Sequence, residues 1–107
     1  MKIKILKADN LTEKDKEMII KLMDVFRKPK GKESITKENV ERVIKQGNNT
    51  VVAAFQGDRI IGIMVLIEGN LFTAKLGIID EVVVDDAYRG KGIASKMMQE
   101  IIKIAKE

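Results

Sequence analysis

The most specific structural pattern of the chain runs from residue 79 to residue 94 and reads IDEVVVDDAYRGKGIA. Its first half, up to Val84, is rich in β-branched residues, which is typical of a strand. Two glycines follow, and beyond them apolar residues recur at helical spacing: Ile93, Ala94, Met97, Met98, Ile101, Ile102 and Ala105. The stretch therefore predicts a strand, a glycine-rich turn and a helix over residues 93–106.

The N-terminal residues predict a strand followed by a helix. Residues 2–7 alternate aliphatic and charged side chains, as a half-buried strand does. Either Asn10 or Thr12 can cap the first helix. Its apolar positions are one helical turn apart: Met18, Ile19, Leu22, Met23 and Phe26.

A basic loop and a second helix come next. Residues 27–32 combine lysines and an arginine with one proline and one glycine, which break a helix. The second helix starts near Ser34 or Thr36 and ends by Gly47. We expect Val40, Val43 and Ile44 to face inward.

The middle of the chain predicts three strands. Residues 50–56 and 59–68 are joined by a two-residue turn and form a β-hairpin. Gly69-Asn70 predicts the next turn, and residues 71–84 predict a third, longer strand. The order β-α-α-β-β-β-α indicates an α/β protein of the α+β type, with helices flanking a mixed, mostly antiparallel sheet.

Length and composition limit the kind of protein. A chain of 107 residues with 45% hydrophobic and 34% charged side chains is expected to form one globular domain over residues 1–107. No apolar run approaches the roughly 20 residues that span a bilayer. The first residues also lack the apolar core of a signal peptide. We therefore expect a cytoplasmic protein without a membrane partner.

Histidine and cysteine are both absent from the chain. Disulfides, thiolate catalysis, Cys-type zinc sites and Ser-His-Asp chemistry are therefore excluded, and no metal site is predicted. An acid–base group must be a carboxylate, a lysine, the single tyrosine Tyr88 or an ordered water. The net charge of +4 favours anionic partners. Nucleic acid is not predicted, because basic residues do not alternate with stacking aromatics.

The turn between residues 84 and 95 has the properties of an anion-binding site. A helix N-terminus leaves backbone amides unsatisfied, and its dipole favours negative charge. Gly90 and Gly92 remove side chains that would hold a phosphate away, while Arg89 and Lys91 add positive charge. Taken alone, however, Gly-Lys-Gly favours an ordinary strand-to-helix turn. It matches neither the Walker pattern nor the dinucleotide-binding fingerprint.

The wider context resembles a known family. The pattern R-x-x-G-x-A at residues 89–94, after the strand at 79–85, resembles motif A of the GNAT N-acetyltransferases. Residues 51–55 and 59–62 resemble the second and third strands of that family, and the order of elements agrees along the whole chain. The resemblance implies transfer of an acetyl group from acetyl-CoA to a primary amine by direct attack. The alternative is a non-catalytic CoA-binding or interaction module with the same fold.

The resemblance also implies roles for individual residues. Backbone groups around Val82 and Val84 would pair with the pantetheine arm, and an amide near Val82 would polarise the thioester carbonyl. Amides from Arg89 to Ser95 would hold the pyrophosphate. The implied cofactor-binding residues are Val82, Val83, Val84, Arg89, Gly90, Lys91, Gly92, Ile93, Ala94 and Ser95.

Asp80 and Glu81 are the candidate catalytic residues. Either carboxylate could take a proton from the amine, directly or through water. An ordinary polar pair at a sheet surface is the alternative. Strict alternation places the two on opposite faces, so at most one faces the cleft. The basic loop at 27–32 lies where the family often builds its acceptor site, although a solvated surface loop also accounts for it.

The sequence departs from the family pattern at its end. The family continues past the motif A helix with a fifth strand, a fourth helix and a final hairpin, whereas this chain stops at Glu107. The tyrosine that often protonates the leaving thiolate is therefore missing, and Tyr88 lies in the wrong element to replace it. The edge of the strand at 71–84 would be unpaired. We expect a homodimer, with a fragment and a natural minimal form as alternatives.

Overall fold

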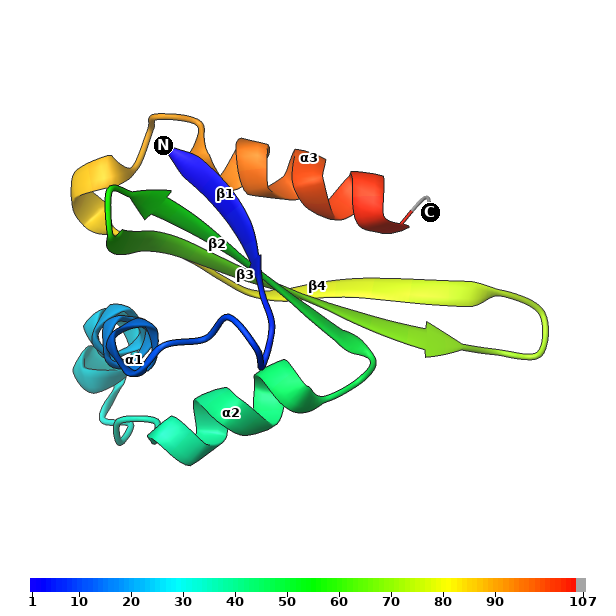
Figure 1. The fold of residues 1–107 in the computed structure, drawn as a ribbon, viewed down its shortest axis with the longest axis horizontal. Helices are drawn as coiled ribbons and strands as arrows, with labels where there is room; N and C mark the ends of the chain where they lie inside the picture. Colours follow the sequence, from blue (N-terminus) through cyan, green and yellow to red (C-terminus); the bar gives the residue numbers. More distant parts are fainter. Residues whose placement is uncertain (106–107) are drawn as a thin grey trace.

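Figure 1 shows the computed structural model of the chain, which describes the backbone of residues 1–105 and the side chains of residues 1–104. The order of elements is the predicted one, with two short 3-10 helices added. In chain order they are β1 (Lys2–Leu6), α1 (Glu13–Arg27), η1 (Lys28–Lys30), α2 (Lys37–Lys45), β2 (Asn49–Gln56), β3 (Arg59–Asn70), β4 (Lys75–Val84), η2 (Asp86–Tyr88) and α3 (Ile93–Ala105).

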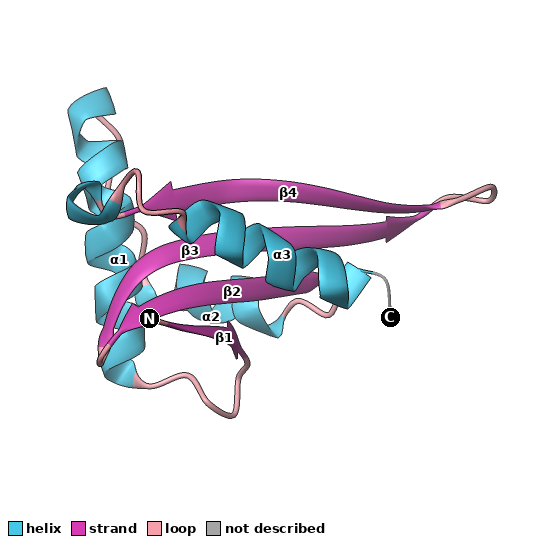
Figure 2. Ribbon diagram, turned by 90° about the horizontal axis from the view of Figure 1, so that it is seen from above, coloured by secondary structure: helices cyan, strands magenta, loops and turns pink. Residues whose placement is uncertain are grey.

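The sheet is antiparallel throughout the described residues and has the strand order β1-β2-β3-β4. Helices α1 and α2 cover one face and α3 covers the other (Figures 1 and 2). Each face has its own apolar core. Leu22, Val51 and Ile63 belong to the core under α1 and α2, whereas Val52, Met64 and Met97 belong to the core under α3. The predicted fold class is confirmed.

Two threonines begin the first two helices. Thr12 Oγ1 accepts a hydrogen bond from the Asp15 amide at 3.0 Å, and the Asp15 carboxylate accepts one from the Thr12 amide at 3.1 Å. Thr36 and Asn39 exchange the same pair at 3.1 and 2.8 Å. Each arrangement is a capping box, and losing such a cap costs about 1 kcal/mol. Of the alternatives left open by the sequence, the structure selects Thr12 and Thr36.

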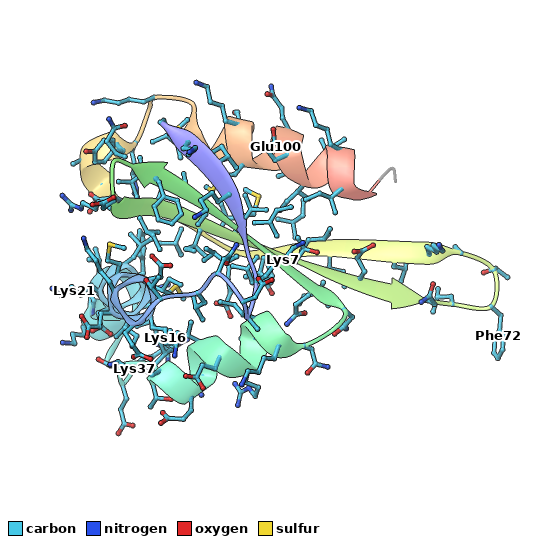
Figure 3. The ribbon with its side chains drawn as sticks, in the orientation of Figure 1. Lys7, Lys16, Lys21, Lys37, Phe72 and Glu100 are labelled. Atoms are coloured by element: carbon cyan, nitrogen blue, oxygen red, sulfur yellow. The ribbon has the colours of Figure 1, made fainter. Side chains whose placement is uncertain are left out.

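The hairpin between β3 and β4 turns later than the sequence predicts. Gly69 and Asn70 stay in the ladder, opposite Leu76 and Lys75, so the predicted turn there is wrong. The chain reverses over residues 71–74, where the Leu71 amide donates to the Ala74 carbonyl at 2.7 Å. Two more residue pairs in the β3–β4 ladder outweigh the local turn preference. The hairpin projects past the helices, with Phe72 exposed at its tip (Figures 1 and 3).

Helix α3 buries a narrower stripe than predicted. Ile93, Met97 and Ile101 are buried, but Ala94 and Ile102 are exposed. The predicted side chain of residue 105 lies outside the described residues. The helix lies close to the sheet at Gly62, where an added Cβ would come 2.9 Å from Met97 Cε. One fully buried residue per turn therefore fills the interface, Met98 packs against its edge, and Ala94 and Ile102 face solvent. Within the described residues, no helix is both long and apolar enough to cross a membrane.

Candidate active site

Asp85 fixes the junction between β4 and α3. Its amide donates to the Ile61 carbonyl at 2.8 Å, which keeps the end of β4 against β3. Its carboxylate accepts hydrogen bonds from the Ala87 amide at 3.0 Å and from Arg59 Nη2 at 2.9 Å. These bonds start η2 and set the direction in which the chain leaves the sheet. The Asp85 carboxylate therefore has a structural role.

Two glycines in left-handed conformations complete the turn. Gly90 has φ 78° and Gly92 has φ 76°, values that a residue with a Cβ rarely adopts. An added Cβ would meet nothing within 4 Å at either position. Backbone conformation, rather than space, therefore requires glycine. The Gly92 carbonyl accepts a hydrogen bond from the Lys96 amide at 3.1 Å, which is the first bond of α3. The amides of residues 93–95 lie before this donor and therefore do not donate within the helix.

A cleft of about 300 Å³ lies over these amides, between the end of β4 and the start of α3. Eight of the ten predicted cofactor-binding residues line it, together with Tyr88. Val83 and Lys91 do not: Val83 is buried in the core under α1 and α2, and Lys91 is exposed. The cleft is called the cradle below. Its lining residues from the predicted set are Val82, Val84, Arg89, Gly90, Gly92, Ile93, Ala94 and Ser95.

The two cations of the turn lie against neighbouring groups. Arg89 Nε is 2.9 Å from Asp86 Oδ1, and its guanidinium lies 5.0 Å from the centre of the Phe26 ring in α1. Lys91 Nζ lies 5.4 Å from the centre of the Tyr88 ring. Arg89 thus ties the turn to α1, and the backbone amides, together with the positive end of the α3 dipole, are the main groups offered to an anion.

A β-bulge interrupts β4 at the candidate catalytic residues. Asp80 pairs with Val65 and Val83 pairs with Ile63, so two residues of β4 oppose the one residue between them on β3. Glu81 has φ 51°, an uncommon conformation for a residue with a side chain. Asp80 Oδ1 accepts a hydrogen bond from the Glu81 amide at 2.7 Å. Strict alternation through this pair, as predicted, is therefore wrong, because the bulge resets the strand.

Glu81 lines a second cavity, of about 310 Å³, between α1, α2 and the sheet, and Asp80 does not. This α1–α2 cavity lies on the face opposite the cradle. The bulge thus directs Glu81 and Val82, which are adjacent in sequence, to cavities on opposite faces of the sheet. The residues lining the α1–α2 cavity are Ile19, Met23, Arg27, Ile35, Asn39, Val40, Arg42, Val43, Ile44, Val51, Ile63, Val65 and Glu81.

Most of the predicted basic loop lies outside this cavity. Only Arg27 of residues 27–32 lines it, while Lys28, Lys30 and Lys32 are exposed. Conversely, Asn39 and Arg42 line the cavity without having been singled out from the sequence. Both are polar residues on an amphipathic helix, a pattern that usually marks a solvent-facing side. No local signal distinguishes them from the other polar residues of α2.

An ion-pair network joins α1 to α2 beside the cavity. Lys16 Nζ donates to Glu13 at 2.8 Å and to Glu41 of α2 at 2.5 Å, and Lys37 lies 3.2 Å from Glu13 (Figure 3). Hydrogen bonds from Lys16 lower the pKa of Glu13 and of Glu41, and the bond to Glu13 raises the pKa of Lys16. The network therefore holds the two helices that wall the cavity.

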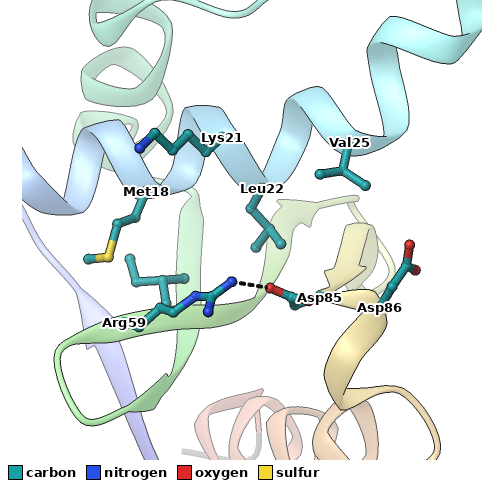
Figure 4. Close-up of a pocket in the computed structure, with 8 residues that line it drawn as sticks. Met18, Lys21, Leu22, Val25, Arg59, Asp85 and Asp86 are labelled. Carbon is teal, nitrogen blue, oxygen red and sulfur yellow. Dashed lines mark hydrogen bonds and ion pairs between the residues drawn. The ribbon is translucent and has the colours of Figure 1, made fainter.

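A third cavity, of about 340 Å³, lies between α1 and the start of β3 (Figure 4). Its charged lining includes Lys21, Asp86 and the Arg59–Asp85 pair described above. Neither candidate catalytic carboxylate nor any cradle glycine lines it. The Asp85 carboxylate, which already accepts two hydrogen bonds, has a structural role there.

Several solved structures with the same fold are acetyltransferases. An aminoglycoside acetyltransferase from an uncultured soil metagenomic sample, in complex with sisomicin, has a TM-score of 0.81 at 20% identity, covering 96% of this chain and 68% of that one. An aminoglycoside 6'-N-acetyltransferase complexed with coenzyme A has a TM-score of 0.77 at 19% identity, covering 96% of this chain and 54% of that one. Ribosomal-protein-alanine N-acetyltransferase from Brucella melitensis biovar Abortus 2308 has a TM-score of 0.76 at 16% identity, covering 99% and 72%.

At these identities the structural similarity establishes a shared fold. No curated protein matches the sequence. The sequence profile of the acetyltransferase (GNAT) family matches residues 16–107, which include most of α1, the whole β2–β4 meander and the cradle. The resemblance read from the motif at residues 89–94 is confirmed. The chain belongs to the acetyltransferase (GNAT) family.

Proposed function

We propose that the protein is an N-acetyltransferase that transfers an acetyl group from acetyl-CoA to a primary amine by direct attack. The observation that carries the proposal is the β4 bulge, which directs Glu81 to one face and Val82 to the other, beside the cradle. Family membership supports acetyl transfer in general. Amine acetylation requires a proton acceptor near the amine and a site that holds the thioester donor, and Glu81 and the cradle are proposed to supply them.

The cradle fits the pyrophosphate of an acyl-CoA. It combines a helix N-terminus, two glycines with positive φ and a lining without acidic side chains. Within the described residues β4 pairs only with β3, so its other edge offers backbone groups at residues 82–84 to the pantetheine arm. When bound, acetyl-CoA supplies an activated thioester. A β4 amide near Val82 is proposed to donate to the thioester oxygen, where negative charge develops.

Glu81 is the proposed proton acceptor. A primary amine is protonated at neutral pH, because its pKa is about 10, and it must lose a proton before it attacks. The Glu81 carboxylate lines the α1–α2 cavity and can take that proton directly or through a water. The Asp80 carboxylate bonds the Glu81 amide instead. We therefore assign Asp80 to holding the bulge and Glu81 to the chemistry.

Release of free thiol from acetyl-CoA, measured with a panel of primary amines, tests the proposal. Removing a general base costs about 100-fold or more, so Glu81→Gln should lower kcat by that order. Glu68→Gln is the matched control, because Glu68 is an exposed glutamate of the same hairpin, opposite Gly77. Binding of acetyl-CoA without thiol release from any amine would favour a non-catalytic CoA-binding module. Failure of acetyl-CoA to raise the melting temperature would contradict both functions.

A further inference from the structure

The α1–α2 cavity carries charges of both signs on an aliphatic lining. Nine of its lining residues are aliphatic or methionine, and the polar ones are Arg27, Asn39, Arg42 and Glu81. The three polar residues from the helices are hydrogen-bond donors or can act as donors, whereas Glu81, from β4, is the acceptor. The two helices thus supply hydrogen-bond donors to the cavity wall, and β4 supplies an acceptor.

Arg27 is held in a fixed orientation. Its Nε donates to the Glu33 carbonyl at 3.0 Å, and the residue is half-buried at the end of α1. The guanidinium is planar, so fixing Nε also fixes the direction of the two terminal amino groups. Within residues 1–105 Arg27 forms no ion pair with an acidic side chain. A fixed guanidinium without an internal counter-charge suits a carboxylate ligand.

Asn39 and Arg42 add donors from α2. They are three residues apart and therefore neighbours on one face of the helix. Asn39 Oδ1 already accepts from the Thr36 amide at 2.8 Å, so its amide NH2 is the group left for a ligand. Arg42 is exposed and, like Arg27, forms no ion pair within the described residues. The two arginines of the lining are thus balanced by Glu81 alone.

We propose that the acceptor is an amino acid-like molecule: a primary amine joined by a short aliphatic segment to a carboxylate. The amine lies at Glu81, the carboxylate at Arg27 and Arg42, and the segment on the aliphatic lining between them. The cavity, at about 310 Å³, is at the small end of ligand pockets, which range over about 300–1,000 Å³. This favours a small molecule over a large polycationic one. The inference rests on the proposed function, since it names the substrate class of the same site.

Matched pairs of amines test the inference. ω-Aminoalkanoates of three to eight carbons (about 4–10 Å long, at roughly 1.3 Å per carbon) are compared with n-alkylamines of the same length, by calorimetric binding to the CoA-saturated protein and by thiol release. We expect the aminoalkanoate of the best length to bind and react about tenfold better than its alkylamine, as a charge-assisted hydrogen bond to arginine provides. Arg42→Gln should remove most of that preference. Lys45→Gln, which deletes a cation from the same last turn of α2 outside this cavity, should retain it.

Reversing the charge gives a second, positive test. Arg42→Glu should shift the preference from aminoalkanoates to α,ω-diaminoalkanes of the same length. Because Arg42 is exposed and forms no ion pair within the described residues, both substitutions are compatible with folding. Equal binding and turnover of aminoalkanoates and alkylamines would overturn this inference and leave the acetyltransferase proposal intact. Preferential binding of aminoalkanoates without any thiol release would support this subsite and contradict the proposed function.

Discussion

Glu81 has a backbone conformation that glycine adopts without strain, so replacing it should separate stability from activity. Its φ of 51° lies in the left-handed region, where a residue with a Cβ stores roughly 1–3 kcal/mol. Glu81→Gly removes that strain and the carboxylate together. Glu81→Ala removes the carboxylate and keeps the strain. The two variants therefore differ only in the backbone term.

The expected difference in the free energy of unfolding is about 1 kcal/mol in favour of Glu81→Gly, after allowance for the greater freedom of glycine in the unfolded chain. In a domain of this size that corresponds to a melting temperature about 4–8 °C higher than that of Glu81→Ala. Urea unfolding measures the free energy, and thiol release measures activity. Both variants should lose activity to the same extent, by about 100-fold or more.

Equal stability of the two variants, or a less stable Glu81→Gly, would refute the reasoning about backbone strain. Full activity in Glu81→Ala would instead refute the role of the carboxylate. A β-bulge that carries backbone strain is expected at positions where function depends on that conformation. At position 81 the backbone conformation thus favours glycine, whereas the proposed proton transfer needs the glutamate carboxylate.

Three further outcomes are expected. Gly92→Ala should cost about 1 kcal/mol of stability because φ is 76°, and it should also weaken acetyl-CoA binding. Gly31→Ala is the control: its φ is 71° and it lies far from the cradle, so it should lower stability without affecting acetyl-CoA binding. Hydrogen bonds from Lys16 lower the pKa of Glu13 and of Glu41 in the folded protein, so they stabilise the fold at pH values above the unfolded pKa of 4.5. This contribution is lost as the pH falls through the folded pKa values. Lys16→Met should therefore make the urea midpoint fall less steeply between about pH 5 and pH 3. Sedimentation at micromolar concentration should show a homodimer if the free edge of β4 pairs with a second copy, and a well-folded monomer would contradict that expectation.

Local chemistry explains how much of the fold is predictable from the sequence. The two capping boxes at Thr12 and Thr36 and the tight turn after Gln56 depend on neighbours within a few residues, and their patterns in the sequence are specific. The cradle glycines are of the same kind, because their φ values are needed within one turn of α3. Element order and fold class therefore followed from the sequence alone.

Two features could not be predicted from the sequence: the turn at residues 71–74 and the narrow buried stripe of α3. The first depends on how far β3 and β4 continue to pair, and the second on how closely Gly62 lets α3 approach the sheet. Both are contacts between segments. Local propensity cannot predict them, since tertiary packing overrides it at this level.

The site divides in the same way. The glycine-rich turn before α3 was predictable from the sequence, because residues 89–95 are contiguous and a helix N-terminus is a local structure. Tertiary structure was needed to show which of Asp80 and Glu81 lines a cavity, because the bulge arises from pairing with β3. It also brought Arg27 and Arg42 to that cavity from two different helices. Hydrogen bonds within one turn can be predicted from residues that are neighbours in the sequence. A cavity, in contrast, is formed by side chains that meet only when the sheet and its covering helices have packed.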